Sequence, residues 1–143
     1  HTAFTTDDAF YNENSIRTYL FCFAGLLFIF LGLILFIWCV SLFAKVGQGT
    51  LAPWDPTRNL VIIGPYRFVR NPMICGVILM LFGQMLLWGS WAVGSWACAF
   101  ICVNHINFVF VEEPGVERRF GESYLYYKTC VPRWIPRLKP WLG

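Results

Sequence analysis

The chain has 143 residues, of which 57% are hydrophobic, 19% are aromatic and only 13% are charged. Because soluble domains usually carry about 25% charged residues, this composition argues against an ordinary soluble domain. The net charge of +3 says little by itself. The charges are segregated, however: no Asp, Glu, Lys or Arg occurs from Thr18 to Ala44 or from Asn71 to Val111.

The N-terminal residues 1–17 are polar with scattered aromatics and no periodicity, so we expect an arm outside the membrane. Residues 18–44 are rich in Phe, Leu, Ile and Gly. About 20 apolar residues suffice to cross a bilayer, so this segment predicts one span. A signal peptide is disfavoured because the segment is too long and acidic residues precede it. Within it, Gly25 and Gly32 predict close helix packing.

Residues 45–70 predict an ordered loop rather than a flexible linker. Prolines here and just beyond fix backbone angles. Large apolar side chains such as Leu51, Trp54 and Tyr66 are interleaved with them.

Residues 71–111 are long enough for two spans if they turn in the middle. Gly89-Ser90 and Gly94-Ser95 supply turn signals. We therefore expect a helix hairpin, with limbs from Pro72 to about Trp88 and from about Trp91 to Val111. A pair of buried soluble helices is the weaker interpretation, because neither limb has a polar face.

The last segment, residues 112–143, begins at a pair of glutamates. Aromatic side chains spaced by four and three residues predict a short amphipathic helix over Glu117–Lys128. The stretch "VPRWIPRLKPW" has three prolines and is not expected to be helical throughout. A headgroup interface suits its aromatic and basic side chains, which are Trp134, Trp141, Arg133, Arg137 and Lys139.

The basic residues predict an orientation. Of the 11 Lys and Arg residues, only Arg17 precedes the first span; four lie in 45–70 and six in 112–143. The positive-inside rule therefore places these two segments in the cytoplasm and the N-terminus outside. The predicted fold class is an all-α integral membrane protein: a single domain over residues 1–143 with about three transmembrane helices, one plus a hairpin. The chain begins with His rather than Met. A protein partner or N-terminal helices missing from this sequence would complete so thin a bundle.

The six cysteines form no C-x-x-C pair, and we expect buried, reduced thiols. No residue pattern supports a metal site. Nucleic-acid binding has no support either, because the basic residues follow the expected membrane interface.

Two elements carry candidate chemistry: the cationic turn Arg67–Asn71 and the carboxylate pair Glu112-Glu113. A hairpin between them returns both to the same membrane face. Alternatively, the arginines reach lipid phosphates and the glutamates end a helix in water. The helix dipole opposes two carboxylates at a helix C-terminus, so a cation should offset them. Arg118 and Arg119 are near candidates, and a cationic ligand is another.

Both signs of charge together suit a zwitterionic small molecule. The helix start near Pro72 and Met73 attracts an anion, and so do the arginines. The glutamates attract a cation or accept from hydroxyls. S-adenosylmethionine has a carboxylate, an ammonium, a sulfonium and ribose hydroxyls, and Tyr66 could pack against such a ligand.

The segments "GTLAPWDPTRNLVIIGPYRFVRNPMICG" and "EEPGVERRFGESYLYYKTCVPRWIPR" resemble the isoprenylcysteine carboxyl methyltransferase family. That family is part of a wider group of membrane methyltransferases that includes phospholipid methyltransferases. The resemblance covers about residues 45–137 and implies S-adenosylmethionine as the cofactor. The cofactor-binding residues that it implies are Arg58, Asn59, Leu60, Val61, Tyr66, Arg70, Asn71, Pro72, Met73, Glu112 and Tyr124.

The sequence departs from the family pattern at three positions. Asn71 replaces a more usual His, and Ile74 stands where bacterial relatives often have Tyr. Phe108 stands where the eukaryotic enzymes carry an Arg linked to substrate. A prenylated-cysteine carboxylate is therefore a doubtful substrate.

The resemblance implies methyl transfer to a lipophilic or small acceptor, in which the protein mainly aligns and desolvates the reactants. The acceptor would enter sideways from the membrane lipid, between the spans, and the cofactor from the cytoplasm. An amine or thiol acceptor needs a base, for which Glu113 and His105 are the catalytic candidates. A hydrogen-bonded packing role for His105 is the alternative.

Two other functions compete with an active methyltransferase. One is a non-catalytic membrane subunit that keeps the fold and binds a partner complex. The other is a membrane reductase with a similar R-H-P turn, against which the E-E-P and F-G-x-x-Y segments argue. Ligand binding distinguishes the three functions. A methyltransferase binds S-adenosylmethionine, a reductase binds a reduced nicotinamide, and a non-catalytic subunit binds neither.

Overall fold

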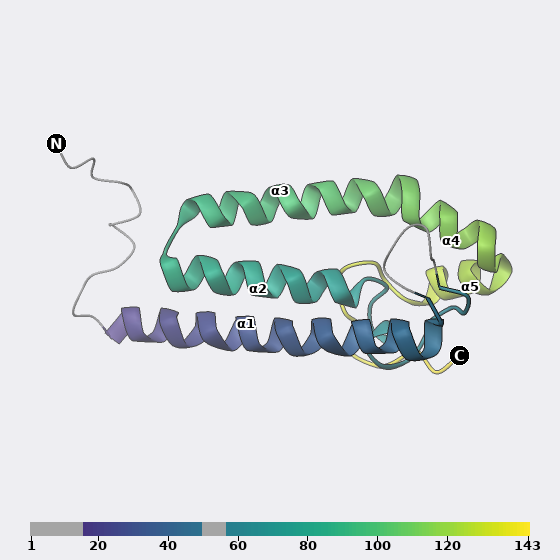
Figure 1. The fold of residues 1–143 in the computed structure, drawn as a ribbon, viewed down its shortest axis with the longest axis horizontal. Coiled ribbons are helices and arrows are strands. Elements are labelled where there is room, and N and C mark those ends of the chain that lie inside the picture. Colours follow the sequence, from purple (N-terminus) through teal and green to yellow (C-terminus); the bar gives the residue numbers. More distant parts are fainter. Residues whose placement is uncertain (1–15, 50–56) are drawn as a thin grey trace.

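The computed structural model describes residues 16–49 and 57–143 (Figure 1). The predicted outer arm falls almost wholly outside these ranges, as do Leu51 and Trp54 of the predicted loop. Every regular element in the described ranges is helical, so the all-α prediction is confirmed. Three long helices, α1 (Ile16–Leu42), α2 (Pro72–Trp88) and α3 (Trp91–Asn107), run side by side, with α2 in the middle.

Two helical stretches among the described residues, Ile16–Gly47 and Trp91–Phe120, are long and apolar enough to cross a membrane. The third, α2, is equally apolar but has only 17 residues. At about 1.5 Å per residue it rises about 25 Å, slightly less than the roughly 30 Å hydrocarbon core. The expected arrangement of one helix plus a hairpin is therefore present, with the first limb of the hairpin shorter than a full span.

Glycines on both helices bring α1 and α2 into direct backbone contact. A Cβ added to Gly32 would lie 2.5 Å from the Gly76 carbonyl oxygen, and one added to Gly25 would lie 2.8 Å from that of Gly83. The two pairs sit seven residues apart on each helix, so they mark one straight antiparallel seam. The predicted packing role of Gly25 and Gly32 is confirmed.

The hairpin turn falls where the Gly-Ser signal predicted it. Gly89 ends α2 in the left-handed conformation (φ 55°), and Ser90 precedes α3. Beyond the turn, α2 packs much less extensively against α3 than it does against α1. Cys98 and Cys102, which were expected to be buried, are exposed on α3.

The polar end of the bundle is more broken than the sequence indicated. A π-helical turn, η3 (Phe108–Glu112), follows α3 and leads directly into α4 (Glu113–Phe120). Gly121, with φ of 55°, then separates α4 from α5 (Glu122–Cys130). The single helix predicted over Glu117–Lys128 was therefore wrong, because the backbone at Gly121 adopts an angle that no helix continues.

The C-terminal tail, residues 131–143, contains no helix, as its prolines predicted. It pairs instead with the turn before α2. The Arg70 amide donates to Pro132 O (2.9 Å), the Arg137 amide to Phe68 O (3.0 Å) and the Trp141 amide to Arg67 O (3.0 Å). Residues 67–70 are thereby fixed between the start of α2 and the end of the chain.

Candidate functional site

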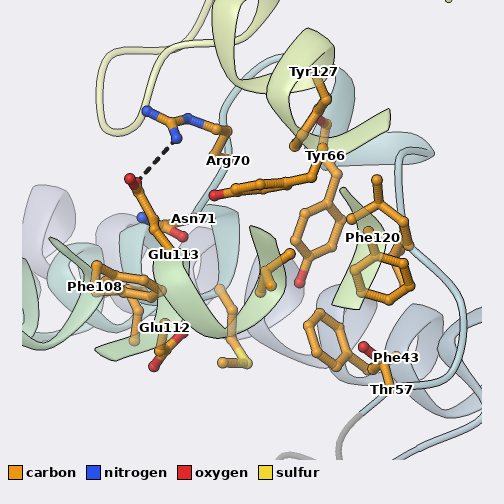
Figure 2. Close-up of a pocket in the computed structure, with 16 residues that line it drawn as sticks. Phe43, Thr57, Tyr66, Arg70, Asn71, Phe108, Glu112, Glu113, Phe120 and Tyr127 are labelled. Atoms are coloured by element: carbon orange, nitrogen blue, oxygen red, sulfur yellow. Dashed lines mark hydrogen bonds and ion pairs between the residues drawn. The ribbon is translucent and has the colours of Figure 1, made fainter. Parts of the chain in front are cut away.

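A pocket opens at the broken end of the bundle, where the start of α2 meets η3, α4, α5 and the loop before α2 (Figure 2). Its unfilled space is about 720 Å³ when the open mouth is counted. The lining residues are Phe43, Thr57, Leu60, Val61, Tyr66, Arg70, Asn71, Met73, Ile74, Phe108, Glu112, Glu113, Val116, Phe120, Tyr124 and Tyr127.

Most of the residues that sequence reasoning assigned to a cofactor site line this one pocket. They come from three separate parts of the chain. Their shared lining follows from the hairpin, which returns η3 to the start of α2. The predicted residues that line the pocket are Leu60, Val61, Tyr66, Arg70, Asn71, Met73, Glu112, Glu113 and Tyr124.

Four predicted residues do not line the pocket. The amides of Arg58 and Asn59 both donate to Gly47 O (2.7 and 3.2 Å), and the Asn59 side chain donates to Val46 O (3.0 Å). These residues therefore fasten the loop to η1 (Phe43–Gly47), the π-helical turn that follows α1. Pro72 is buried in the first turn of α2. The fourth residue, His105, lies on α3 and is exposed.

Glu113 is buried and is held by cations from three elements. Its Oε1 accepts from Arg70 Nη1 (3.0 Å) and Arg133 Nε (2.7 Å), and its Oε2 accepts from Arg133 Nη2 (2.9 Å). Lys128 Nζ lies 3.5 Å from Oε2. The hydrogen bond to Glu113 raises the pKa of the Arg133 guanidinium. With both oxygens engaged, Glu113 is an anchor in this arrangement, and its role as a base stays a prediction.

The cations that offset the glutamate pair are not the ones nearest in sequence. Arg119, one of the two expected, donates to Thr57 O (3.2 Å) and lies over the Phe120 ring. Arg118 is exposed. The cations that contact Glu113 in the described ranges are Arg70, Lys128 and Arg133. The prediction of Arg118 and Arg119 was therefore wrong for this glutamate.

The Glu112 carboxylate has fewer polar partners among the described residues than the Glu113 carboxylate has. Within residues 16–49 and 57–143, only the Asn107 side chain hydrogen bonds it, with Nδ2 donating to Oε1 (2.9 Å). The two residues are five apart, the spacing that a π-helical turn places on one side. In the same turn the Glu113 amide donates to Phe108 O. The turn thus leaves the Glu112 carboxylate at the pocket, and π-turns are frequent at functional sites.

Two buried donors beside the pocket lack an acceptor among the described residues. They are Arg70 Nε and Asn71 Nδ2, on adjacent residues at the start of α2. Asn71 occupies the N-cap position of α2, yet its side chain makes no capping hydrogen bond. A buried unsatisfied donor costs about 1–3 kcal/mol. The positive end of the α2 dipole lies at the same place, so this wall of the pocket suits an anionic group.

Aromatic side chains form the opposite wall. Tyr66 packs against Phe43 with ring centroids 5.7 Å apart, and the Tyr127 hydroxyl donates to Tyr66 O (2.6 Å). Burial raises the pKa of Tyr66 and of Tyr127, so both remain neutral phenols. Tyr124 is buried beside them, and burial also raises its pKa.

Sequence reasoning missed several lining residues as site residues. The spacing of Phe120 and Tyr127 did identify one apolar helix face, but nothing indicated that a pocket lay against it. Phe43 gave no signal, because the whole first span is apolar. The complete set of missed lining residues is Phe43, Thr57, Ile74, Phe108, Val116, Phe120 and Tyr127.

Trp134 of the C-terminal tail separates His105 from the pocket. Its indole Nε1 donates to His105 Nδ1 (3.0 Å), and its ring meets Phe108 edge-on at 5.8 Å. The Cys75 thiol donates weakly to the backbone carbonyl of Trp134 (3.9 Å). Trp134 thus joins α2 to α3 behind Phe108. The structure does not bring His105 into the pocket, and its predicted role as a base has no geometric support.

Three long apolar helices that carry a pocket with both signs of charge at one end define an all-α membrane protein with a candidate small-molecule site. A profile of the phospholipid methyltransferase family matches residues 20–123. This match spans most of the chain, so the chain belongs to this family of membrane methyltransferases. No curated protein and no solved structure matches it. In the described ranges, no three His, Cys, Asp or Glu residues are grouped to hold a metal.

Proposed function

We propose that the protein transfers a methyl group from S-adenosylmethionine to a lipophilic or small acceptor at the cytoplasmic face of a membrane. One observation carries the proposal. The donors Arg70 Nε and Asn71 Nδ2, which have no acceptor among the described residues, belong to the same pocket as the Glu112 carboxylate, which has a single side-chain partner there (Figure 2). Family membership supplies the reaction class.

The pocket lining offers a partner for each polar group of the proposed cofactor. The cofactor carboxylate would satisfy Arg70 Nε and Asn71 Nδ2, where a charge-assisted hydrogen bond is strong. The Glu112 carboxylate would take the ammonium or the ribose hydroxyls. Tyr66 and Phe43 supply an apolar surface for the adenine. When bound, the cofactor supplies an electrophilic methyl group on its sulfonium.

The acceptor is a carboxylate, a thiol or an amine in this proposal. The Phe108 ring forms the pocket wall at the end of α3. A cationic side chain at this position would bind an anionic acceptor, whereas the apolar ring does not. The Arg70, Lys128 and Arg133 cations of the site are all directed at Glu113. A prenylated-cysteine carboxylate is therefore a poor candidate. An acceptor carried by membrane lipid would reach the pocket through the bilayer.

Calorimetry on the detergent-solubilised protein tests the cofactor. We expect S-adenosylmethionine and S-adenosylhomocysteine to bind the wild type with micromolar affinity, and Glu112→Gln to weaken S-adenosylmethionine by about tenfold or more, as the loss of a charged hydrogen-bond partner does. Glu122→Gln is the matched control, because Glu122 is exposed and lies outside the pocket. Failure of a well-folded wild type to bind either compound would contradict the proposal. It would favour a non-catalytic subunit that binds a protein partner.

A further inference from the structure

Arg133 stands behind the pocket rather than in its wall. It belongs to the C-terminal tail, its side chain is 24% exposed, and it is absent from the lining. Its guanidinium nonetheless makes the closest contacts to the Glu113 carboxylate, with Nε 2.7 Å from Oε1 and Nη2 2.9 Å from Oε2. Two parallel bonds of this kind fix the plane of a carboxylate as well as its position.

The orientation of the Glu113 carboxylate in turn restrains the Arg70 guanidinium. The oxygen that accepts from Arg133 Nε also accepts from Arg70 Nη1 (3.0 Å). Arg70 lines the pocket, and its side chain is only 10% exposed. Because Nη1 is bonded to Glu113 while Nε has no acceptor among the described residues, the direction in which Nε points depends on where the Glu113 carboxylate is held.

Lys128 is a poor substitute for Arg133. Its ammonium lies 3.5 Å from Glu113 Oε2 and 3.6 Å from Glu117 Oε2, and its side chain is 36% exposed. A lysine is a point charge on a flexible stem, whereas an arginine presents a rigid fork. Without Arg133, Glu113 keeps a nearby positive charge but loses the partner that fixes its orientation.

We propose that Arg133 is a positioning residue: through Glu113 it aims the Arg70 guanidinium into the pocket, toward the anionic group of the ligand. The inference rests on the proposed function for the nature of that ligand, but the geometric part does not need the ligand. Arg133 acts on the site from the C-terminal tail, although it does not itself line the pocket.

Arginine-selective labelling of the unliganded protein tests the geometric part. Phenylglyoxal modifies accessible guanidinium groups, and peptide mass spectrometry reports the extent at Arg70. We expect Arg133→Ala to increase the labelling rate at Arg70 severalfold, and Arg133→Lys to give an intermediate rate because it keeps the charge but not the fork. An unchanged rate at Arg70 in Arg133→Ala would overturn the proposal, whatever the pocket binds.

Arg137→Ala is the control for a general effect of loosening the tail. Arg137 anchors the same segment, with Nη1 donating to Cys130 O (2.6 Å), but it does not contact Glu113. We expect Arg137→Ala to leave the Arg70 labelling rate close to that of the wild type. Equal increases in Arg133→Ala and Arg137→Ala would show that the tail only covers Arg70, and the positioning role would be rejected.

Binding of S-adenosylhomocysteine provides the second readout. We expect Arg133→Ala to weaken it by about tenfold, as the loss of a supporting partner behind a direct ligand commonly does. In a double-mutant cycle with Glu113→Gln, Arg133→Ala should add little further loss, because its effect passes through Glu113. Fully additive losses would refute that route. A wild type that binds no S-adenosylhomocysteine while Arg70 labelling still responds to Arg133→Ala would reject the proposed function and leave the positioning role standing.

Discussion

At the scale of single residues, the site contains buried donors that a bound ligand would satisfy. Asn71 stands at the N-cap of α2 without capping it, and its buried Nδ2 has no acceptor among the described residues. Natural structures rarely leave such donors unpaired, so each one requires an explanation. Asn71 should therefore affect stability and ligand binding in opposite directions.

The variant Asn71→Ala tests this. We expect the Tm of the unliganded protein to rise or stay level, since the unpaired donor costs about 1–3 kcal/mol. Cofactor binding should weaken by about tenfold, the loss of one good hydrogen bond. Thermal unfolding and calorimetry measure the two effects. Asn59→Ala is the matched control: its Nδ2 donates to Val46 O, so its loss should lower the Tm. A clear drop in Tm for Asn71→Ala would contradict the interpretation.

The sequence was enough to predict that Arg70 and Glu112 would line one pocket, because a hairpin must return its ends to the same face. It was not enough to predict which cations would hold Glu113. Arg118 and Arg119 are nearer in the chain, but Arg133 reaches the carboxylate because the tail folds back onto residues 67–70. That return depends on tertiary backbone pairing, which leaves no periodic signal in the sequence.

At the scale of the helices, the rigid part of the molecule is the seam between α1 and α2. Gly25 and Gly32 face Gly83 and Gly76 across it, with no room for a methyl group. In a bilayer, close backbone contact and van der Waals packing replace the hydrophobic effect as the force between helices. The seam therefore holds the start of α2, and with it Arg70 and Asn71, in place.

Gly32→Ala should lower stability markedly. Its Cβ would lie 2.5 Å from the Gly76 carbonyl oxygen, so the two backbones must separate, and overpacking of this kind typically costs about 1–3 kcal/mol. Gly115→Ala in α4 is the control, since a Cβ there meets nothing within 4 Å. It should be neutral or stabilising by up to about 1 kcal/mol. Thermal unfolding in detergent compares them, and equal Tm values for both variants would argue against a tight seam.

Helix boundaries followed from local signals wherever those signals existed. Pro72 and Gly89 bound α2 as expected, because each residue has a backbone preference that suits a helix end. The π-turn η3 had no such signal: "FVFVE" reads as continuous helix. The break at Gly121 was missed because the aromatic periodicity continues across it. Periodicity reports which face is apolar, whereas a break requires the backbone angle of one residue.

At the scale of the whole molecule, the charges and the pocket lie at the same end. Four segments gather around the start of α2 and the C-terminal ends of α1 and α3, namely α4, α5, the tail and the loop that precedes α2 (Figure 1). Most of the Lys and Arg residues lie in these segments. The positive-inside rule predicts that this end faces the cytoplasm, where a soluble cofactor is available.

Protease protection tests that orientation. A fluorescent protein fused after Gly143 should resist protease added to intact cells and be digested only after the membrane is permeabilised. A tag before His1 should show the opposite pattern if the N-terminus is outside. Digestion of the C-terminal fusion in intact cells would show the opposite topology. The pocket would then face the outside, where a cytoplasmic cofactor is not available.

The pairing of the tail with residues 67–70 also has a consequence for biosynthesis. The ribosome makes the lining residues Arg70 and Glu113 before it makes Arg133. The nascent protein therefore passes through a stage in which Glu113 lacks the arginine that bonds both of its carboxylate oxygens. The Arg133 contacts to Glu113 form only when residues 131–143 have emerged and folded back onto residues 67–70. A product truncated before Arg133 would keep all three long helices yet lack an ordered site, so interrupted translation would yield membrane-inserted but inactive protein.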